Sequence, residues 1–387
     1  MAEKGFKSTK KLRPKYFFGF GRGLMTEEPI QSGDVILSIP ENLLISPHLV
    51  LKSYLGTFFE RHCPNASGQE ILSTFLMCEK IKAETSEWYP YIKSLPKSYS
   101  LPSYFCDHAW SLLPESIFVE AQKHSETLKR SFETLTDLFR HLEIAHPIFR
   151  SGLDFELYKW AYCSVNTRCV YLKCAGKSCL GESCTYHLSL APFLDLLNHH
   201  VEAQIIAGFN EEKKKFEITC FRDIKKYSQV FINYGCHSNR KLFLEYGFVI
   251  PRNSNDCIPF TIDEVILSIH SCKISHLARK LSFIQKKHLT RALSCSCDGI
   301  SWNLAIVLQI LCSDHDVRWW ESNFHNALEA RQDENTYETL KRNLLLLKLQ
   351  EYNLKSSKSM EHGCSEHHLL INDLLQIEKS ILTKALQ

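Results

Sequence analysis

The pattern of apolar and polar positions changes period several times along the chain. Residues 34–40, "DVILSIP", form a short β-rich run that follows the turn residues Ser32 and Gly33 and ends at a proline. From about residue 68 the apolar residues recur at helical spacing, and a long amphipathic pattern covers residues 115–143. These patterns predict a strand that is followed by a helical region.

A further helix and a second strand-rich region come next. The helix is predicted over residues 154–165, with Asp154 in a capping position at its start. The segments "EAQIIAGFN" and "KFEITCF" flank the polar turn "EEKK", and this arrangement predicts a β-hairpin. The segment "QVFIN" supplies another short strand.

From about residue 262 onward the spacing of apolar residues is helical again. The clearest helical patterns cover residues 301–312, 336–354 and 366–386. The expected fold class is therefore α+β. We expect a β-rich part that is split by a long helical insert and followed by an all-helical C-terminal domain.

Charge and hydropathy exclude several classes of protein. The 387 residues include 46 basic and 43 acidic side chains, and a formal net charge of +3 gives no strong positive field. No run of about 18 apolar residues occurs, and the first residues do not have the pattern of a signal peptide. We therefore expect no direct nucleic-acid or membrane binding, and a location in the cytoplasm and nucleus.

The cysteines are numerous but scattered. Many of the sixteen lie inside apolar runs, where reduced cysteine is a common small buried residue. Cys174, Cys179 and Cys184, with His187 after them, have four-residue gaps that do not match the C-x₂-C pairs of structural zinc sites. We predict a reduced surface loop there and no metal site.

Two apolar segments each stop at polar side chains. "APFLDLLNHH", residues 191–200, ends in Asn198 and two histidines, and "VFINYG" stops at Asn233 and Tyr234. Polar residues at the ends of short, irregular strands indicate a site that is assembled from distant segments.

These segments resemble the SET-domain protein lysine methyltransferases, in the branch related to the Rubisco large-subunit methyltransferase. The other segments that carry the resemblance are "GFGRGLMTEEPIQSGDVILSIP", "SYLGTF", "WYPYIKSLPKSY" and "CSVNTRCVYL". "GRG" alone is a weak signal, but "LDLLNH" followed by "INYG" and "EYGF" is specific. The resemblance implies a SET domain over residues 16–250, with its insert at about 51–155, and a helical substrate-binding domain over 257–387.

The resemblance also implies a reaction. S-adenosylmethionine is the expected methyl donor, and the ε-amine of a lysine in a histone or non-histone protein is the expected acceptor. A protein-histidine methyltransferase on the same fold is an alternative, and so is a non-catalytic SET-like protein that binds a partner. The presence of both Asn198 and Tyr234 argues against the non-catalytic alternative. A monomer is expected.

The resemblance assigns a set of residues to cofactor binding. Glycine lets the backbone come close to a ligand, and the guanidinium of Arg168 is suited to a bidentate clamp on the α-carboxylate of the cofactor. The amide of Asn198 offers donors and an acceptor for the amino-acid end of the cofactor. The full set is Gly21, Arg22, Gly23, Leu24, Arg168, Asp195, Asn198, His199 and Tyr234.

Two members of this set have less specific roles. His199 is expected to bind adenine through its backbone groups, since a lone buried histidine is usually structural. Asp195 lies three residues before Asn198, and it acts either as an orienting residue or as a cap. The sequence favours neither role.

Tyr234 is the expected catalytic residue. A lysine with a reference pKa of about 10.4 is almost wholly protonated at neutral pH, so the site has to bind the neutral amine. An apolar aromatic channel favours the neutral form by desolvation, and alignment of the reacting atoms supplies the rest of the catalysis. Phe231, Tyr246 and Phe248 are expected in the wall of this channel, although core packing explains Phe248 equally well.

Overall fold

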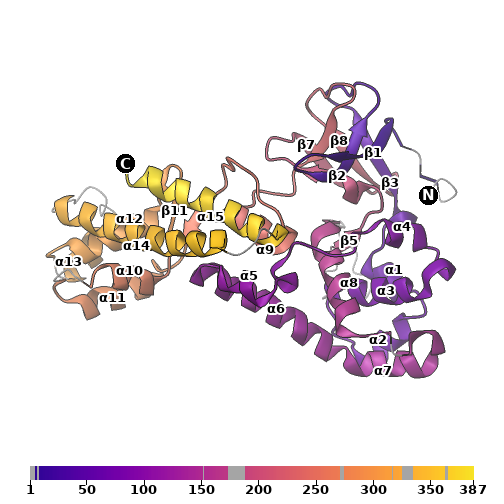
Figure 1. Ribbon diagram of the computed structural model, residues 1–387, viewed down its shortest axis with the longest axis horizontal. Helices are drawn as coiled ribbons and strands as arrows, with labels where there is room; N and C mark the ends of the chain where they lie inside the picture. The colour runs from indigo at the N-terminus through magenta and orange to yellow at the C-terminus, as the bar shows by residue number, and fades with distance from the viewer. Residues whose placement is uncertain are drawn as a thin grey trace. The chain divides into compact units, whose positions relative to one another are not determined.

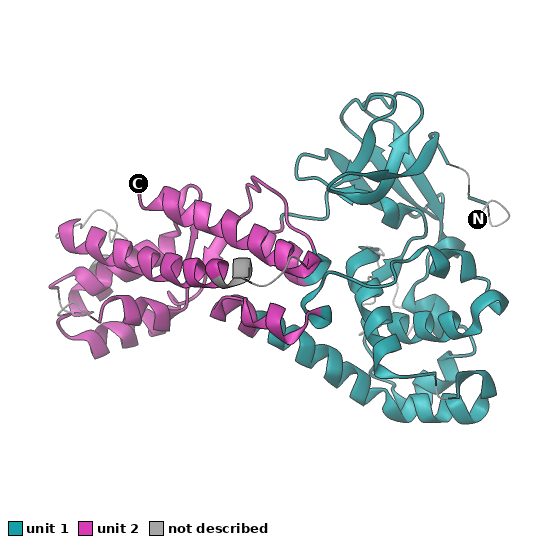
Figure 2. Ribbon diagram, viewed as in Figure 1, with its two compact units in different colours: residues 1–104, 120–236, 245–247 teal, residues 105–119, 237–244, 248–387 magenta. Residues whose placement is uncertain are grey.

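The computed structural model describes residues 5–6, 8–150, 152–172, 188–270, 274–315, 317–324, 334–361 and 365–387. The chain divides into two compact units (Figure 2). Unit 1 comprises residues 1–104, 120–236 and 245–247, and unit 2 comprises residues 105–119, 237–244 and 248–387. These units are defined by contacts and do not coincide with the predicted domains, residues 16–250 and 257–387. The predicted domains therefore stay a prediction. The predicted cysteine loop, with Cys174, Cys179 and Cys184, lies outside the described residues.

The first sheet of unit 1 brings the two polar-ended segments side by side. Its strand order is β1-β2-β9-β6. The pairs β1/β2 and β2/β9 are antiparallel, whereas β6 runs parallel to β9 with Asn198 opposite Phe231. The strands are β1 (Leu12–Phe17), β2 (Gly21–Thr26), β6 (Asn198–His199) and β9 (Gln229–Ile232).

The predicted hairpin is confirmed in a second sheet, of order β3-β8-β7. Burial alternates along β8, where Phe216, Ile218 and Cys220 face the core of the strand-rich part. A third sheet pairs β4 with β5. The strands are β3 (Val35–Pro40), β4 (Cys169–Tyr171), β5 (Leu188–Leu190), β7 (Ile205–Asn210) and β8 (Lys215–Cys220).

The helices of unit 1 form a part that is distinct from its strands (Figure 1). Helices α3 and α8 pack against each other within a large apolar cluster. The predicted cap is confirmed, because the carboxylate of Asp154 accepts the N–H of Leu157 at 2.8 Å. Unit 1 contains α1 (Pro47–Leu51), α2 (Gly56–His62), α3 (Gly68–Lys82), α4 (Tyr89–Ser94), α7 (Thr136–Ala145) and α8 (Phe155–Arg168).

The amphipathic pattern over residues 115–143 forms two helices rather than one. Helix α6 (Glu115–Thr134) and helix α7 are separated at Leu135. The N–H of Leu135 bonds to the carbonyl of Phe132, three residues earlier, and this tighter bond interrupts the regular helical ladder. The apolar period continues across the break, so it does not reveal where one helix ends.

Unit 2 is mainly helical, and the helices predicted near residues 301–312, 336–354 and 366–386 are confirmed. It also holds a small sheet of order β10-β11-β12, which the expectation of an all-helical domain did not include. Strands of two or three residues are too short to show an alternating pattern. The elements are α5 (Asp107–Ser111), α9 (Asn239–Tyr246), which continues into unit 1, β10 (Cys257–Pro259), α10 (Ile262–Ser268), α11 (Leu277–Lys286), β11 (Ser294–Ser296), β12 (Gly299–Ile300), α12 (Trp302–Cys312), α13 (Val317–Asn323), α14 (Glu334–Glu361) and α15 (Glu366–Ala385).

A buried ion pair ties elements of unit 2 together. Arg240 on α9 and Glu378 on α15 are joined at 3.1 Å, with side chains only 5% and 4% exposed, and Tyr352 bonds to both. None of the helices in the described ranges is both long and apolar enough to cross a membrane.

Candidate functional site

The turn between β1 and β2 contacts the end of the first apolar segment. Gly21 has a positive φ of 72°, which glycine adopts without strain. A Cβ on Gly23 would lie 2.7 Å from Nδ2 of Asn198 and 2.6 Å from Nε2 of Gln229. The amide of Asn198 donates to the backbone carbonyls of Phe20 and Arg22, at 3.4 Å each. Only glycine at position 23 leaves room for this approach.

The side chains of the two residues that flank Gly23 make contacts elsewhere in unit 1. The guanidinium of Arg22 donates to the backbone carbonyl of Ser94, the last residue of α4. The side chain of Leu24 is fully buried in the apolar core of the strands. Leu24 therefore offers only its backbone to a ligand.

Arg168, the last residue of α8, forms an ion pair with Asp195. Its Nη1 lies 3.1 Å from the carboxylate oxygen Oδ2 and 3.0 Å from the backbone carbonyl of the same residue. The hydroxyl of Tyr91 donates to the same Oδ2 at 3.1 Å. The side chain of Asp195 is 3% exposed and that of Arg168 is 17% exposed.

The electrostatics of this pair follow from its burial. Burial raises the pKa of Asp195, and the charge and hydrogen bond of Arg168 oppose that shift. Burial by itself would lower the pKa of Arg168, but the Asp195 carboxylate and two nearby tyrosines raise it. Nε of Arg168 is buried and has no hydrogen-bond partner within the described residues. One guanidinium N–H is thus left for an additional acceptor.

Tyr234 is held at both its backbone and its side chain. Its hydroxyl donates to the carbonyl of Leu197 at 2.8 Å, and its N–H donates to Nδ1 of His199 at 3.1 Å. His199 is 2% exposed, and its Nδ1 is an acceptor in this bond. Burial raises the pKa of Tyr234, so the phenol stays neutral.

Two groups of aromatic rings lie beside the segment that ends in Asn198 and His199. Tyr234 lies 5.1 Å from His199 and 5.3 Å from Tyr246, measured between ring centroids. Burial, together with the charge of Glu245, raises the pKa of Tyr246 to about 12. Phe231 instead packs against Phe20 and His200, with centroids at 5.1 and 5.3 Å.

A pocket of about 420 Å³ opens beside the second group of rings. Its lining includes Phe231, His200 and Gln229, together with the loops on either side of β7 and β8. Phe248 belongs to unit 2, where its N–H bonds to the carbonyl of Leu242. The predicted role of Phe248 as a channel wall stays a prediction.

Sequence reasoning missed two residues of this site. Tyr91 binds Asp195, and its only signal was its place inside the quoted segment "WYPYIKSLPKSY". Gln229 lies against Gly23, and its Nε2 is buried without a partner among the described residues. The sequence of β9, "QVFI", gives no sign of this contact.

One short segment joins all these parts. Within residues 195–199, Asp195 binds Arg168 and the carbonyl of Leu197 binds Tyr234. Asn198 binds the β1–β2 turn, and His199 binds the backbone of Tyr234. We call residues 195–199 the central segment.

Comparison with known proteins identifies the class of this fold. Residues 21–235 match the family model of the SET domain, and the chain belongs to the SET-domain family. It is 33% identical over 384 residues to SET domain-containing protein 4 of Homo sapiens, which covers 97% of this chain and 85% of that protein. The Mus musculus protein of the same name is 35% identical over 319 residues, or 81% of this chain and 71% of that protein. The resemblance seen in the sequence is confirmed.

Other relatives and solved structures are more distant. Actin-histidine N-methyltransferase of Danio rerio is 27% identical over 296 residues, which cover 76% of this chain and 48% of that protein. The SET domain of LSMT, solved bound to lysine and AdoHcy, has a TM-score of 0.70 at 19% identity, covering 100% of this chain and 88% of that one. Rubisco LSMT bound to AdoMet has a TM-score of 0.63 at 18% identity, with coverage of 99% and 88%. These structures confirm the α+β SET fold.

Proposed function

We propose that the protein is an S-adenosylmethionine-dependent methyltransferase that methylates the ε-amine of a lysine in a protein substrate. The observation that carries this proposal is the central segment, residues 195–199. It contacts the glycine turn, the buried arginine and the buried tyrosine that the family resemblance assigns to cofactor and catalysis. Membership of the SET-domain family supports the same reaction class.

The residues present fit S-adenosylmethionine. The close approach at Gly23 provides backbone surface for a ligand, and the partnerless Nε of Arg168 suits the carboxylate of the cofactor. Asn198 adds an amide with both donors and an acceptor. The bound cofactor would supply an electrophilic methyl group on a sulfonium centre.

Tyr234 would orient the incoming amine. Its hydroxyl donates to the carbonyl of Leu197, and a phenol oxygen that donates its proton can also accept an N–H from a lysine. The burial that raises the pKa of Tyr234 and of Tyr246 would lower the pKa of an amine placed beside them. The neutral amine, which carries the lone pair that attacks the methyl group, is thereby favoured.

Histidine methylation is the competing function. The similarity to actin-histidine N-methyltransferase of Danio rerio favours it, but that match covers 48% of the relative. The structural similarity over the whole chain to LSMT, which was solved with bound lysine, supports a lysine acceptor. We therefore propose lysine, with histone and non-histone proteins both included.

We propose that residues 257–387 recognise the protein substrate and do not bind the cofactor. The segments that carry the family resemblance end near residue 250, and the family match ends at residue 235. We further propose that the protein acts as a monomer in the cytoplasm and nucleus.

The proposed function is tested by labelling a proteome. The purified protein is incubated with a cell extract and S-adenosylmethionine that carries a deuterated methyl group, and tandem mass spectrometry locates the label. The proposal predicts label on lysine side chains that falls sharply with Tyr234→Phe and is retained with Tyr227→Phe, which alters an exposed tyrosine. Label on histidine rings would replace the lysine proposal, and no transfer at all would refute methylation.

A further inference from the structure

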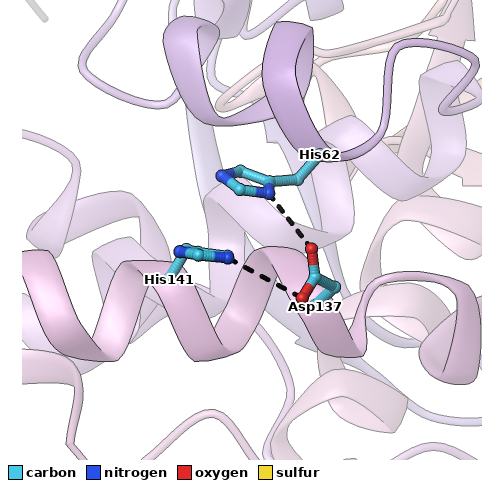
Figure 3. Close-up of side chains that lie close together, drawn as sticks. All are labelled: His62, Asp137 and His141. Carbon is cyan, nitrogen blue, oxygen red and sulfur yellow. Dashed lines mark hydrogen bonds and ion pairs between the residues drawn. The ribbon is translucent and has the colours of Figure 1, made fainter.

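A second cluster of ionisable side chains lies in the helical part of unit 1. Helix α2 ends at His62, and helix α7 carries Asp137 and His141 (Figure 3). Nδ1 of His62 lies 3.1 Å from Oδ2 of Asp137, and Nε2 of His141 lies 3.7 Å from Oδ1. One ligand atom from each residue lies within 4.8 Å of the other two.

Helix geometry explains why the three side chains meet. Asp137 and His141 are four residues apart, so they project from the same face of α7. Helix α2 packs against α7 and presents His62 to that face. The two imidazole rings are stacked, with centroids 3.9 Å apart and an angle of 20° between their planes. Each ring turns a nitrogen toward the carboxylate of Asp137 (Figure 3).

The ligand types and spacing match a transition-metal site. Two imidazoles and one carboxylate are ligands that Zn²⁺ accepts, usually with a fourth position open to water. Metal–ligand bonds of about 2.0–2.2 Å in a tetrahedral site place the ligand atoms roughly 3.3 Å apart. The nitrogens of His62 and His141 lie 3.1 and 3.7 Å from the two different carboxylate oxygens of Asp137, and both separations are close to that value.

The alternative to a metal site is that His62, Asp137 and His141 are held only by hydrogen bonds and ion pairs among protein side chains. The guanidinium of Arg140 lies 3.7 Å from Oδ1 of Asp137 and already supplies a cation to that carboxylate. A metal ion would bind an unprotonated nitrogen of each ring together with that carboxylate.

We propose that His62, Asp137 and His141 bind a divalent transition-metal cation, with Zn²⁺ as the preferred ion. The ion would join the end of α2 to the first turns of α7. The site shares no residue with the central segment, so this proposal is independent of the proposed methyl transfer. Of the described residues, these three are the group that offers His, Cys, Asp or Glu ligands at such spacing.

The test compares zinc binding by matched variants of the full-length protein. His62→Gln and His141→Gln each remove one ligand, and His124→Gln changes an exposed histidine on α6 as a control. Because the chain has sixteen cysteines, and thiolates are zinc ligands, the informative quantity is the difference in zinc binding between variants. Each protein is treated with a chelator and titrated with Zn²⁺ by calorimetry.

We expect wild type and His124→Gln to bind one equivalent of Zn²⁺ that both ligand variants bind at least about tenfold more weakly. Zn²⁺ should also raise the Tm of wild type and the control more than that of the two variants. Equal stoichiometry and affinity in all four proteins would overturn the proposal.

A second measurement does not depend on the folding of any variant. Crystals of the wild-type protein are soaked in Zn²⁺, and anomalous scattering is recorded at the zinc edge. The proposal predicts a peak between His62, Asp137 and His141. Zinc peaks only at other positions would overturn it.

Discussion

Arg168 and Asp195 form a buried ion pair in which Nη1 lies 3.1 Å from Oδ2. From the sequence we expected Arg168 to clamp the carboxylate of the cofactor, and that role stays a prediction. In the structure its Nη1 donates to the carboxylate of Asp195. Of the two roles considered for Asp195, this contact fits that of an orienting residue. The buried N–H at Nε of Arg168 is therefore available to a ligand.

Replacing Arg168 with methionine should destabilise the protein strongly. The change leaves Asp195 buried without its cation, which typically costs about 3–5 kcal/mol. Urea unfolding of Arg168→Met measures the loss. Arg222→Met is the matched control, because Arg222 and its partner Glu202 are 64% and 71% exposed and should contribute at most about 1 kcal/mol. Equal losses in the two variants would contradict the account.

Gly23→Ala should weaken cofactor binding while the fold survives. The added Cβ would meet the ends of two flexible side chains, so Asn198 and Gln229 can move aside at small cost to the backbone. Displacing Asn198 removes hydrogen bonds worth about 1–3 kcal/mol, or roughly 5- to 150-fold in affinity for S-adenosylmethionine. Calorimetric titration measures the affinity, and Gly208→Ala is the control because nothing lies within 4 Å of its added Cβ. Unchanged affinity in Gly23→Ala would exclude this contact from the cofactor site.

Tyr234→Phe should lower turnover by roughly 10²-fold. The ring would still pack against His199 and Tyr246, so only the hydroxyl and its bond to Leu197 are lost. That lost bond should cost about 0.5–1.5 kcal/mol of stability. Affinity for S-adenosylmethionine should change little, and a methylation assay beside Tyr227→Phe separates the two effects. A Tyr234→Phe protein with wild-type turnover would show that Tyr234 is not catalytic.

The pH dependence of kcat/KM should distinguish the two acceptors. Burial raises the pKa of Tyr234, and for a phenol this extends the neutral form to higher pH. Tyr234 should therefore cause no loss of activity up to about pH 10. The neutral fraction of a lysine with a pKa of about 10.4 grows tenfold per pH unit, so log kcat/KM should still be rising at pH 9.

A histidine acceptor would give a different profile. Its reference pKa of about 6.5 predicts a plateau above about pH 7.5. A plateau there in the wild-type profile would contradict the lysine proposal. A fall in rate below pH 10 that disappears in Tyr234→Phe would show that the phenol ionises earlier than its burial implies.

The sequence predicted the site residues at the ends of strands. It did not predict the contacts between segments that are far apart in the chain. Asn198 and Tyr234 could be selected because each ends an apolar run, and the pairing of β6 with β9 brings those ends together. The bond between Tyr91 and Asp195 joins residues 104 positions apart, and no local period encodes it. Phe193 has a positive φ of 77° just before the central segment. This backbone conformation is rare for phenylalanine, so the sequence does not predict it.

A crystal structure with S-adenosylhomocysteine tests the central claim most directly. The account predicts that the ligand lies against Gly23 and Asn198, that its carboxylate is within hydrogen-bond distance of Arg168, and that its sulfur faces the side of the site where Tyr234 lies. Ligand density that leaves the central segment, residues 195–199, without a contact would contradict the account.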